Sequence, residues 1–408
     1  MVKKIYIFFL MISILIFNGC SKVSNNISEN VTANINNSII NTDSNLRFFS
    51  NKDFYDYTEQ DAKVTGIKID NDKKLTINDD SKSLNILSSN TGDILDKINV
   101  VNENYFVREF NGNNQFVVWI EGDTKGFGGE YDKIIEWSIY SKNLKNNEIK
   151  LIEKSKYKKE DIKLKEYETY EPNSLELYND SLVYRSYDLE DGNIISKINY
   201  KKILENEEKV IFKSKEIIKE SVFEPKIFDK YITFLIGKNI NNNSNSRQIF
   251  KNIDLFLYDI EKNKLEQISY SLPITSSNLY GDKIVFSSFD KDNEMVDSLY
   301  IYDIKTKNIK KLLYKNSKIE KFLNKNNLSN VMIGSLELDS RYIYIRIQGD
   351  YSPLIYDMEK EEFIYIKDFM DNIIKSELMI ASKGDEKTLE VYIAGNSLEN
   401  KIFEFNLK

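Results

Sequence analysis

The chain has 408 residues, of which 41% are hydrophobic, so it is long enough and apolar enough to bury a substantial core. Its formal net charge of −7 argues against nucleic acid or an anionic surface as the partner, although a local basic patch is compatible with that total. With no histidine and one cysteine, the sequence excludes a Ser-His-Asp triad, imidazole metal ligation and an internal disulfide.

Residues 1–19 are predicted to be an export signal. Lys3 and Lys4 precede a predominantly apolar run of 13 residues that ends at Phe17, and Asn18-Gly19 leads into the single cysteine, Cys20. A membrane-spanning helix needs about 20 apolar residues, so a retained transmembrane anchor is disfavoured.

The stretch from Phe17 to Cys20 resembles the lipobox of bacterial lipoproteins, although that family usually has Leu where Phe17 stands and a smaller residue where Asn18 stands. The resemblance implies a palmitate-bearing Cys20 and a protein anchored at the extracytoplasmic face of the cell membrane. The alternative is an ordinary secretory signal in which the cysteine is coincidental.

Residues 20–45 are expected to be the lipidated cysteine and a flexible tether, because residues 21–45 are rich in Ser, Asn and Thr and contain no aromatic residue. Ile39 and Ile40 leave open a first strand of the folded domain. The domain itself is expected to span residues 46–408.

Two kinds of hairpin alternate from residue 46 onward. The first kind is an apolar strand, a tight Asn, Asp or Gly turn and a second strand rich in β-prone residues. Its copies are 67–77, 108–120, 175–186, 226–236, 278–288, 336–347 and, least clearly, 379–393.

The second kind contains an aromatic-ended strand, a polar turn and another strand, and is clearest where Tyr-Asp precedes the turn at 255–268, 299–312 and 353–366. Weaker copies occupy 84–98, 137–152 and 197–212, and a terminal strand at 402–405 ends the series. The equivalent positions lie 44 to 60 residues apart, at Leu87, Tyr140, Tyr200, Tyr258, Tyr302, Tyr356 and Phe405.

Paired hairpins with a period near 50 residues predict an all-β protein, a β-propeller of four-stranded antiparallel blades. Seven blades fit the spacing best, and six or eight remain possible. The alternative is a generic antiparallel protein such as a β-sandwich. The Tyr-Asp hairpins are similar to those of TolB-like (WD40-like) bacterial propellers, which implies a binding scaffold of the cell envelope that engages a protein.

No Gly-x-Ser-x-Gly elbow or phosphate-binding glycine loop occurs, so we predict no cofactor and no metal, and we favour a non-catalytic role over an enzymatic one. Carboxylate acid–base chemistry stays open, because 64 acidic residues offer many pairs. The acidic segment 290–297 also suits a calcium ion, but it lacks the glycine and the final glutamate of a helix-flanked calcium loop.

Connections between the second and third strands of blades two to five are expected to be long polar loops, at 119–137, 186–196, 237–252 and 288–298. They would place a candidate binding face at Trp119, Glu121, Asp123, Tyr187, Asp188, Phe289, Asp290 and Asp292. The favoured function is an anchored, non-catalytic scaffold that binds an envelope protein or a cell-wall glycan. A carbohydrate-active enzyme or a small-solute sensor are the alternatives.

Overall fold

The computed structural model of the chain describes residues 39–61, 66–123, 136–156, 172–190, 193–205, 207–214, 220–238, 253–269, 272–290, 293–325, 333–347, 353–366, 369–370, 378–383, 388–394 and 401–408. Within them, seven antiparallel four-stranded sheets follow one another along the chain, and the fold is a seven-bladed β-propeller. Two of these sheets gain a fifth strand. The predicted fold class is therefore confirmed.

By its internal contacts the chain divides into two compact units. The first unit contains three complete sheets. The first sheet is made of β4 (Ile67–Asp70), β5 (Lys73–Ile77), β6 (Ser83–Ser88) and β7 (Ile94–Asn99). The second is made of β8 (Phe106–Gly112), β9 (Phe116–Gly122), β10 (Trp137–Asn143) and β11 (Ile149–Lys154). The third is made of β12 (Asn173–Tyr178), β13 (Ser181–Glu190), β14 (Asn193–Lys202) and β15 (Glu207–Lys213).

The division between the units falls within the fourth sheet, made of β16 (Glu220–Phe228), β17 (Tyr231–Lys238), β18 (Ile253–Asp259) and β19 (Lys264–Gln267). The second unit holds the remaining sheets. The fifth contains β20 (Ile274–Tyr280), β21 (Lys283–Asp290), β22 (Asn293–Asp303) and β23 (Ile309–Leu313). Helix α2 (Lys318–Lys325) leads from it to the sixth, which contains β24 (Ile333–Leu338), β25 (Tyr342–Ile347), β26 (Pro353–Asp357) and β27 (Glu362–Tyr365).

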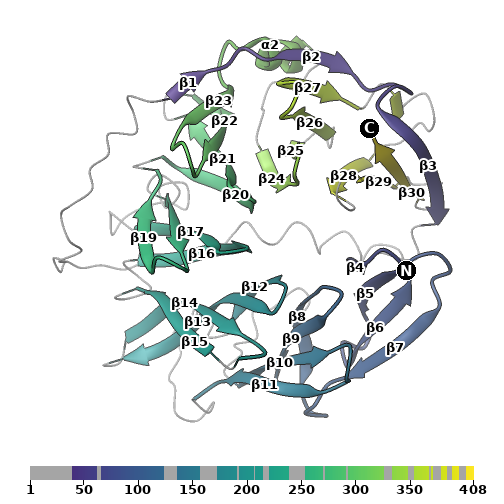
Figure 1. Cartoon of the computed structure of the whole chain (residues 1–408), viewed down its shortest axis with the longest axis vertical. Coiled ribbons are helices and arrows are strands. Elements are labelled where there is room, and N and C mark those ends of the chain that lie inside the picture. Colours follow the sequence, from purple (N-terminus) through teal and green to yellow (C-terminus); the bar gives the residue numbers. More distant parts are fainter. Residues whose placement is uncertain are drawn as a thin grey trace. The chain divides into compact units, whose positions relative to one another are not determined.

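Three N-terminal strands run along the outer edges of the last three sheets. β1 (Ile39–Asn41) pairs parallel with β23, and β2 (Asn45–Phe48) pairs parallel with β27. β3 (Phe54–Asp61) pairs antiparallel with β30 (Lys401–Leu407) and completes the seventh sheet, which also contains β28 (Leu378–Lys383) and β29 (Thr388–Ala394). Figure 1 shows these strands in purple beside the sheets they join. β1 thus lies inside the segment expected to be a tether.

The Tyr-Asp repeat has a local physical cause. Each aspartate accepts a backbone N–H from three residues downstream: Asp259 from Lys262 at 2.9 Å, and Asp303 from Thr306 at 2.7 Å. This side-chain-to-backbone bond closes the turn, as Asp does in many tight turns. The Tyr-Asp repeat therefore marks the turn between the third and fourth strands of a sheet.

The hairpins formed by the first two strands of a sheet have a different kind of turn. Asn179, Asp229 and Gly281 each have a positive φ, at 52°, 53° and 58°, and each is the first residue of a two-residue turn. Such turns need a left-handed backbone, which Asn, Asp and Gly adopt most readily. The Asn/Asp/Gly turns noted in the sequence therefore fix the pairing of the first two strands.

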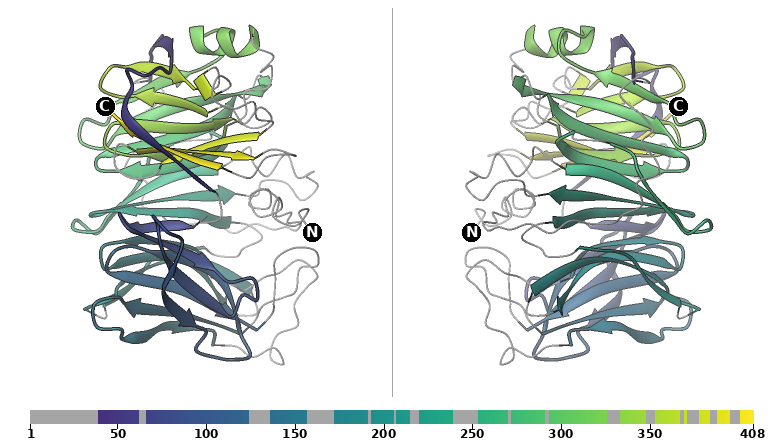
Figure 2. Two further views of the ribbon diagram at one scale, coloured as in Figure 1. Left: turned by 90° about the vertical axis from the view of Figure 1, so that its right-hand side faces the viewer. Right: turned by 90° about the vertical axis from the view of Figure 1, so that its left-hand side faces the viewer.

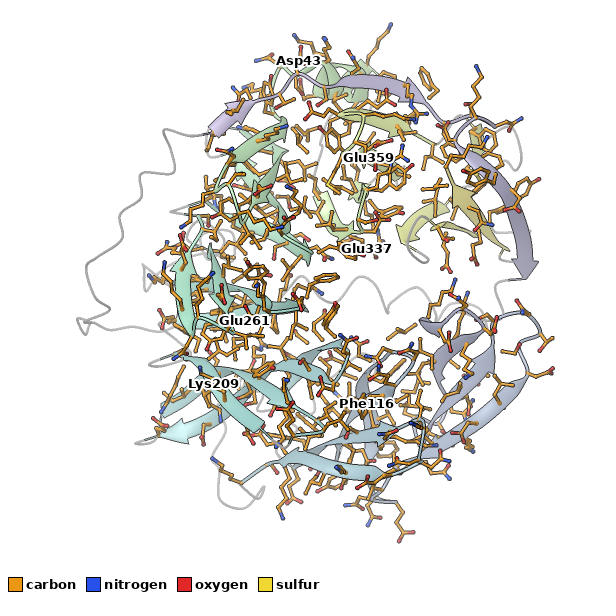
Figure 3. All side chains as sticks on the ribbon, viewed as in Figure 1. Asp43, Phe116, Lys209, Glu261, Glu337 and Glu359 are labelled. Atoms are coloured by element: carbon orange, nitrogen blue, oxygen red, sulfur yellow. The ribbon has the colours of Figure 1, made fainter. Side chains whose placement is uncertain are left out.

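The core lies between neighbouring sheets. One cluster joins Phe116 and Trp137 of the second sheet to Leu182 and Tyr184 of the third. Figure 3 labels Phe116, which is 2% exposed, among these packed side chains. Strands in the middle of these sheets are therefore covered by side chains on both faces. Several candidate residues on such strands are buried as a result.

Candidate functional site

Trp119 and Glu121 are buried, so their predicted place on the candidate binding face was wrong. Their side chains are 1% and 0% exposed, because β9 is covered by packed side chains on both faces. The ring of Trp119 stacks on that of Tyr140 with centroids 5.7 Å apart. Both residues are part of the packed interior of the first unit.

Glu121 has a structural use for its charge. It accepts the indole N–H of Trp119 at 2.8 Å and the backbone N–H groups of Val101 and Asn102 at 2.6 and 3.1 Å. Asp123 follows β9 and is partly exposed, while residues 124–135 of that expected loop lie outside the described residues. Glu121 therefore ties the start of the first-to-second sheet connection to β9.

Two of the expected long loops are paired strands, so those predictions are corrected. β13 and β14 stay in register as far as Glu190 opposite Asn193. β21 and β22 likewise pair as far as Asp290 opposite Asn293. Continued pairing satisfies the backbone polar groups of these segments, which an irregular loop would leave to water.

The candidates at the end of β21 are therefore strand residues or lie outside the described part. Phe289 is partly buried on β21. Asp290 is the last residue of that strand, and its side chain is not among those described. Asp292 and most of 237–252 fall outside the described residues.

Asp297, at the end of the segment considered for calcium, is 1% exposed on β22. Its Oδ2 accepts the backbone N–H of Ile333 at 2.6 Å, and burial raises its pKa to about 7. Through this hydrogen bond the carboxylate of Asp297 holds the start of β24. Among the residues that the structure describes, no cluster of three acidic or cysteine side chains could ligate a metal.

Tyr187 and Asp188 do lie in a region rich in charged groups, but they point to opposite faces of β13. Side chains alternate along a strand, so residues 184 and 188 share one face and residues 185 and 187 share the other. The first face meets the end of β11, and the second meets β16. β13 is therefore the central strand of the candidate site.

The first face carries paired charges. Asp188 lies 3.3 Å from the Nζ of Lys156 and 3.5 Å from that of Lys197. On the same face the hydroxyl of Tyr184 donates to Glu153 at 2.5 Å. Each acidic group here has a partner within the third sheet or the adjoining edge of the second.

Burial shifts the acid–base properties of this pair. It raises the pKa of Glu153, although the hydrogen bond from Tyr184 opposes that rise. Burial and the neighbouring Glu153 carboxylate raise the pKa of Tyr184 well above its ordinary value. Tyr184 therefore stays protonated and acts as a donor at neutral pH.

The second face carries Arg185, which is 6% exposed. Its Nη1 donates to the carbonyl of Val222 on β16 at 2.9 Å. Its Cζ lies 5.1 Å from the centre of the Tyr187 ring and 5.7 Å from that of Phe223, within cation–π range. Its Nε is buried without a hydrogen-bond partner.

Arg185 differs from two other arginines of the chain. Arg341 binds Asp357 through Nε and Nη2, at 3.1 and 2.7 Å. Arg47 binds Glu362 through Nε at 2.6 Å and also contacts Asp53. Across the described residues Arg185 has no carboxylate partner, so its charge is balanced only by a carbonyl dipole and two ring faces.

Tyr187 and Asp188 were predicted from the sequence, whereas Arg185 and Glu153 were not. Both missed residues sit inside strands that were expected to be structural. A usable signal was present in the Tyr184 to Tyr187 stretch, where a cation stands between aromatic residues on a buried strand. A long charged side chain at such a position needs a partner, because burial of an unpaired charge is costly.

Comparisons with known proteins show the fold. No protein-family model and no curated protein matches the sequence. A prolyl endopeptidase structure matches with a TM-score of 0.54 and 10% identity, over 86% of this chain and 48% of that one, so this chain spans about half its length. The β-propeller domain of the Trilobed protease from Pyrococcus furiosus matches with a TM-score of 0.51 and 13% identity, over 82% of this chain and 90% of that one.

An oligogalacturonate lyase in complex with manganese matches more weakly, with a TM-score of 0.42 and 10% identity, over 83% of this chain and 74% of that one. The two matches with TM-scores above 0.5, at 10% and 13% identity, show a shared fold and leave activity to the site itself. The Pyrococcus domain is described as having an open velcro topology, whereas β3 of this chain pairs with β30. No helix within the described residues is long and apolar enough to cross a membrane.

Proposed function

We propose that the chain is a lipoprotein of the extracytoplasmic membrane face, lipidated at Cys20, whose propeller is a non-catalytic binding scaffold. The signal-like residues 1–19 and the Gly19-Cys20 junction support the anchor. The rigid sheets with short turns support a scaffold, because a propeller offers surfaces whose geometry does not depend on ligand.

One observation favours binding and indicates its chemistry. Arg185 is a buried guanidinium held between Tyr187 and Phe223, with no carboxylate partner in the described chain. A planar cation with unused donors is suited to a carboxylate, and the Arg341–Asp357 pair shows that geometry within the same chain. The ligand is therefore an acidic group on an envelope protein or a cell-wall glycan.

Contact with a ligand carboxylate would use Nη2 of Arg185. Nη1 is committed to Val222, and Nε is enclosed. The rings of Tyr187 and Phe223 hold the guanidinium plane in place, so little side-chain entropy is lost on binding. Removal of the charge should weaken ligand binding by roughly 10- to 100-fold, since a hydrogen bond to a charged group contributes about 1.5–3 kcal/mol.

A cross-linked pull-down from the native envelope tests the scaffold. The anchored wild type would be compared with Arg185→Gln and with Asp188→Asn, which changes the opposite face of the same strand. Loss of one partner with Arg185→Gln alone supports the proposal. Equal partner sets in all three proteins, with unchanged thermal unfolding, would exclude Arg185 as the binding residue and make glycan-cleavage assays the next experiment.

The anchor is tested separately by labelling cells with a palmitate analogue. Full-length protein should incorporate the label and fractionate with membranes, while Cys20→Ala should do neither. Label on the Cys20→Ala protein, or none on the wild type, would overturn the lipoprotein assignment. Neither result would bear on the proposal that Arg185 binds a ligand.

A further inference from the structure

The segment from Lys305 to Lys325 is strongly basic within an acidic protein. It contains eight lysines, at 305, 307, 310, 311, 315, 318, 321 and 325, and one acidic residue, Glu320. The chain as a whole has a formal charge of −7. Charge of one sign concentrated in this way creates a local field that the net charge does not reveal.

The structure places this segment beside the N-terminal strands. β23 lies within it and pairs with β1, where Ile40 stands opposite Lys310 and is 55% exposed. Helix α2 lies against β2, where the rings of Phe322 and Phe48 meet with centroids 5.8 Å apart. Phe48 is 50% exposed. Figures 1 and 2 show α2 next to β2 at the margin of the second unit.

Helix α2 directs its lysines outward. Ile319 and Leu323 are fully buried on its inner face, while Lys318, Lys321 and Lys325 are exposed at a spacing that places them on the outer face. The helix start is fixed by Ser317, whose Oγ accepts the N–H of Glu320 at 3.2 Å. The basic face is thus held in one orientation.

Acidic residues compensate only part of this charge. Four of the eight lysines have ion pairs: Lys305 with Asp282 at 2.8 Å, Lys307 with Glu266 at 2.7 Å, Lys310 with Glu361 at 2.5 Å and Lys318 with Asp43 at 3.6 Å. Glu320 is 6% exposed, and its carboxylate accepts the N–H of Asn316 at 3.0 Å. Lys315, Lys321 and Lys325 are exposed and form no ion pair within the described chain.

We propose that this surface, formed by Lys315, Lys321, Lys325, Ile40 and Phe48 and called here the α2 edge, docks onto anionic lipid headgroups. The inference rests on the proposed anchor at Cys20. Residues 21–38 separate that cysteine from β1, and 18 residues extend at most about 60 Å, so the acyl group and the α2 edge meet the same membrane.

Lipid is favoured over other polyanions because the surface combines charge with exposed apolar groups. The lysines are attracted to the anionic membrane surface over a screening distance of about 8 Å. Once the protein is at the surface, Phe48 and Ile40 can insert into the headgroup region of the bilayer. Each lysine near an anionic membrane contributes roughly a fivefold increase in partitioning. A basic patch adds to the attachment that the acylated cysteine supplies, because two membrane signals hold a protein more firmly than either alone.

The test uses unlipidated protein, residues 21–408, and vesicles of phosphatidylglycerol and phosphatidylcholine in a 3:7 ratio. Wild-type protein should sediment with these vesicles at low salt and be released at high salt. It should not bind vesicles of pure phosphatidylcholine. The triple variant Lys315→Gln, Lys321→Gln and Lys325→Gln should partition at least tenfold less.

A matched control removes three exposed lysines elsewhere, at Lys97, Lys145 and Lys238, and should bind as the wild type does. Equal loss in both triple variants, or no vesicle binding by the wild type, would overturn the docking proposal. So would binding to soluble polyphosphate without binding to vesicles. Palmitate labelling of the full-length α2-edge variant should stay normal, so failure of docking and failure of the anchor give different results.

Discussion

Glu121 accepts the indole N–H of Trp119 at 2.8 Å inside the packed second sheet of the propeller. Its two carboxylate oxygens also receive the backbone N–H groups of Val101 and Asn102. One buried carboxylate therefore satisfies three donors: the buried indole N–H of Trp119 and two partly buried backbone N–H groups. Residues that looked suited to a ligand instead hold two adjacent sheets together.

Replacing Glu121 with alanine should lower the free energy of unfolding by about 3 kcal/mol, because the buried indole N–H of Trp119 and two partly buried backbone N–H groups lose their acceptor. Urea unfolding followed by tryptophan fluorescence would measure the change. Glu148→Ala is the control, since that side chain is 51% exposed and should change stability by less than about 0.5 kcal/mol. A loss below about 1 kcal/mol for Glu121→Ala would mean that water replaces the carboxylate.

The Tyr-Asp hairpins allow a second comparison. Asp357 is fully buried and binds Arg341 through two hydrogen bonds, whereas the equivalent Asp303 is 22% exposed and pairs with Lys283. Burial alone would raise the pKa of Asp357, but the bonds from Arg341 outweigh it and hold that pKa below its ordinary value.

Asp357→Ala should therefore cost about 3–5 kcal/mol of stability, because it removes the buried carboxylate and leaves the Arg341 guanidinium only the exposed Glu359 at 3.2 Å. Asp303→Ala should cost about 1–2 kcal/mol, mostly through the lost turn bond to Thr306. Chemical denaturation of both variants under identical conditions tests the ranking. Equal costs would show that the turn, and not the ion pair, supplies the stability.

Most of the fold could be read from the sequence because its local signals agree. The Asn179 and Gly281 turns impose tight hairpins, and the Asp259 and Asp303 side chains close the outer ones. These features act over a few residues, so they are visible in a single sequence. The pairing of β3 with β30 was not foreseen, because it joins segments more than 300 positions apart and leaves no local pattern.

That long-range pairing makes a third prediction. A chain starting at residue 45 lacks β1 and should lose amide protection only in β23, the strand that β1 covers. A chain starting at residue 62 lacks β2 and β3 as well, and the loss of β3 would expose Phe403 and Phe405 and lower the melting temperature by about 10 °C or more. Hydrogen exchange of β30 distinguishes the two: its protection should survive the first truncation and disappear in the second. Retained protection in the second would show that β30 is held by β29 alone.

The candidate site was harder to predict, since exposure depends on which sheet faces are covered. Trp119 and Glu121 were assigned to a loop that lies partly beyond the end of β9, yet both residues belong to the strand. Tyr187 and Asp188 were grouped as neighbours, but strand alternation sends them to opposite faces. The role of Arg185 could not be predicted from the sequence, because its partners Val222 and Phe223 belong to β16 of the next sheet.

Asp297 gives stability a pH dependence of definite sign. Burial raises its pKa to about 7, against about 4 in an unfolded chain. Below pH 4 both states keep the proton, so the group has no effect. As pH rises from 4 to 7 the unfolded state ionises first, and the folded state becomes less stable, by at most about 4 kcal/mol above pH 7.

Asp297→Asn removes this ionisation and keeps an oxygen that can accept the Ile333 N–H. The variant should match the wild type at pH 4 and exceed its free energy of unfolding by about 2–4 kcal/mol at pH 8. Asp303→Asn is the control of opposite sign: although burial alone would raise the pKa of Asp303, the hydrogen bond from Lys283 holds it below its ordinary value, so its charge stabilises the fold above pH 4. Urea unfolding at both pH values would measure these differences. Parallel pH profiles for the wild type and Asp297→Asn would show that the carboxylate is hydrated or paired in the folded protein.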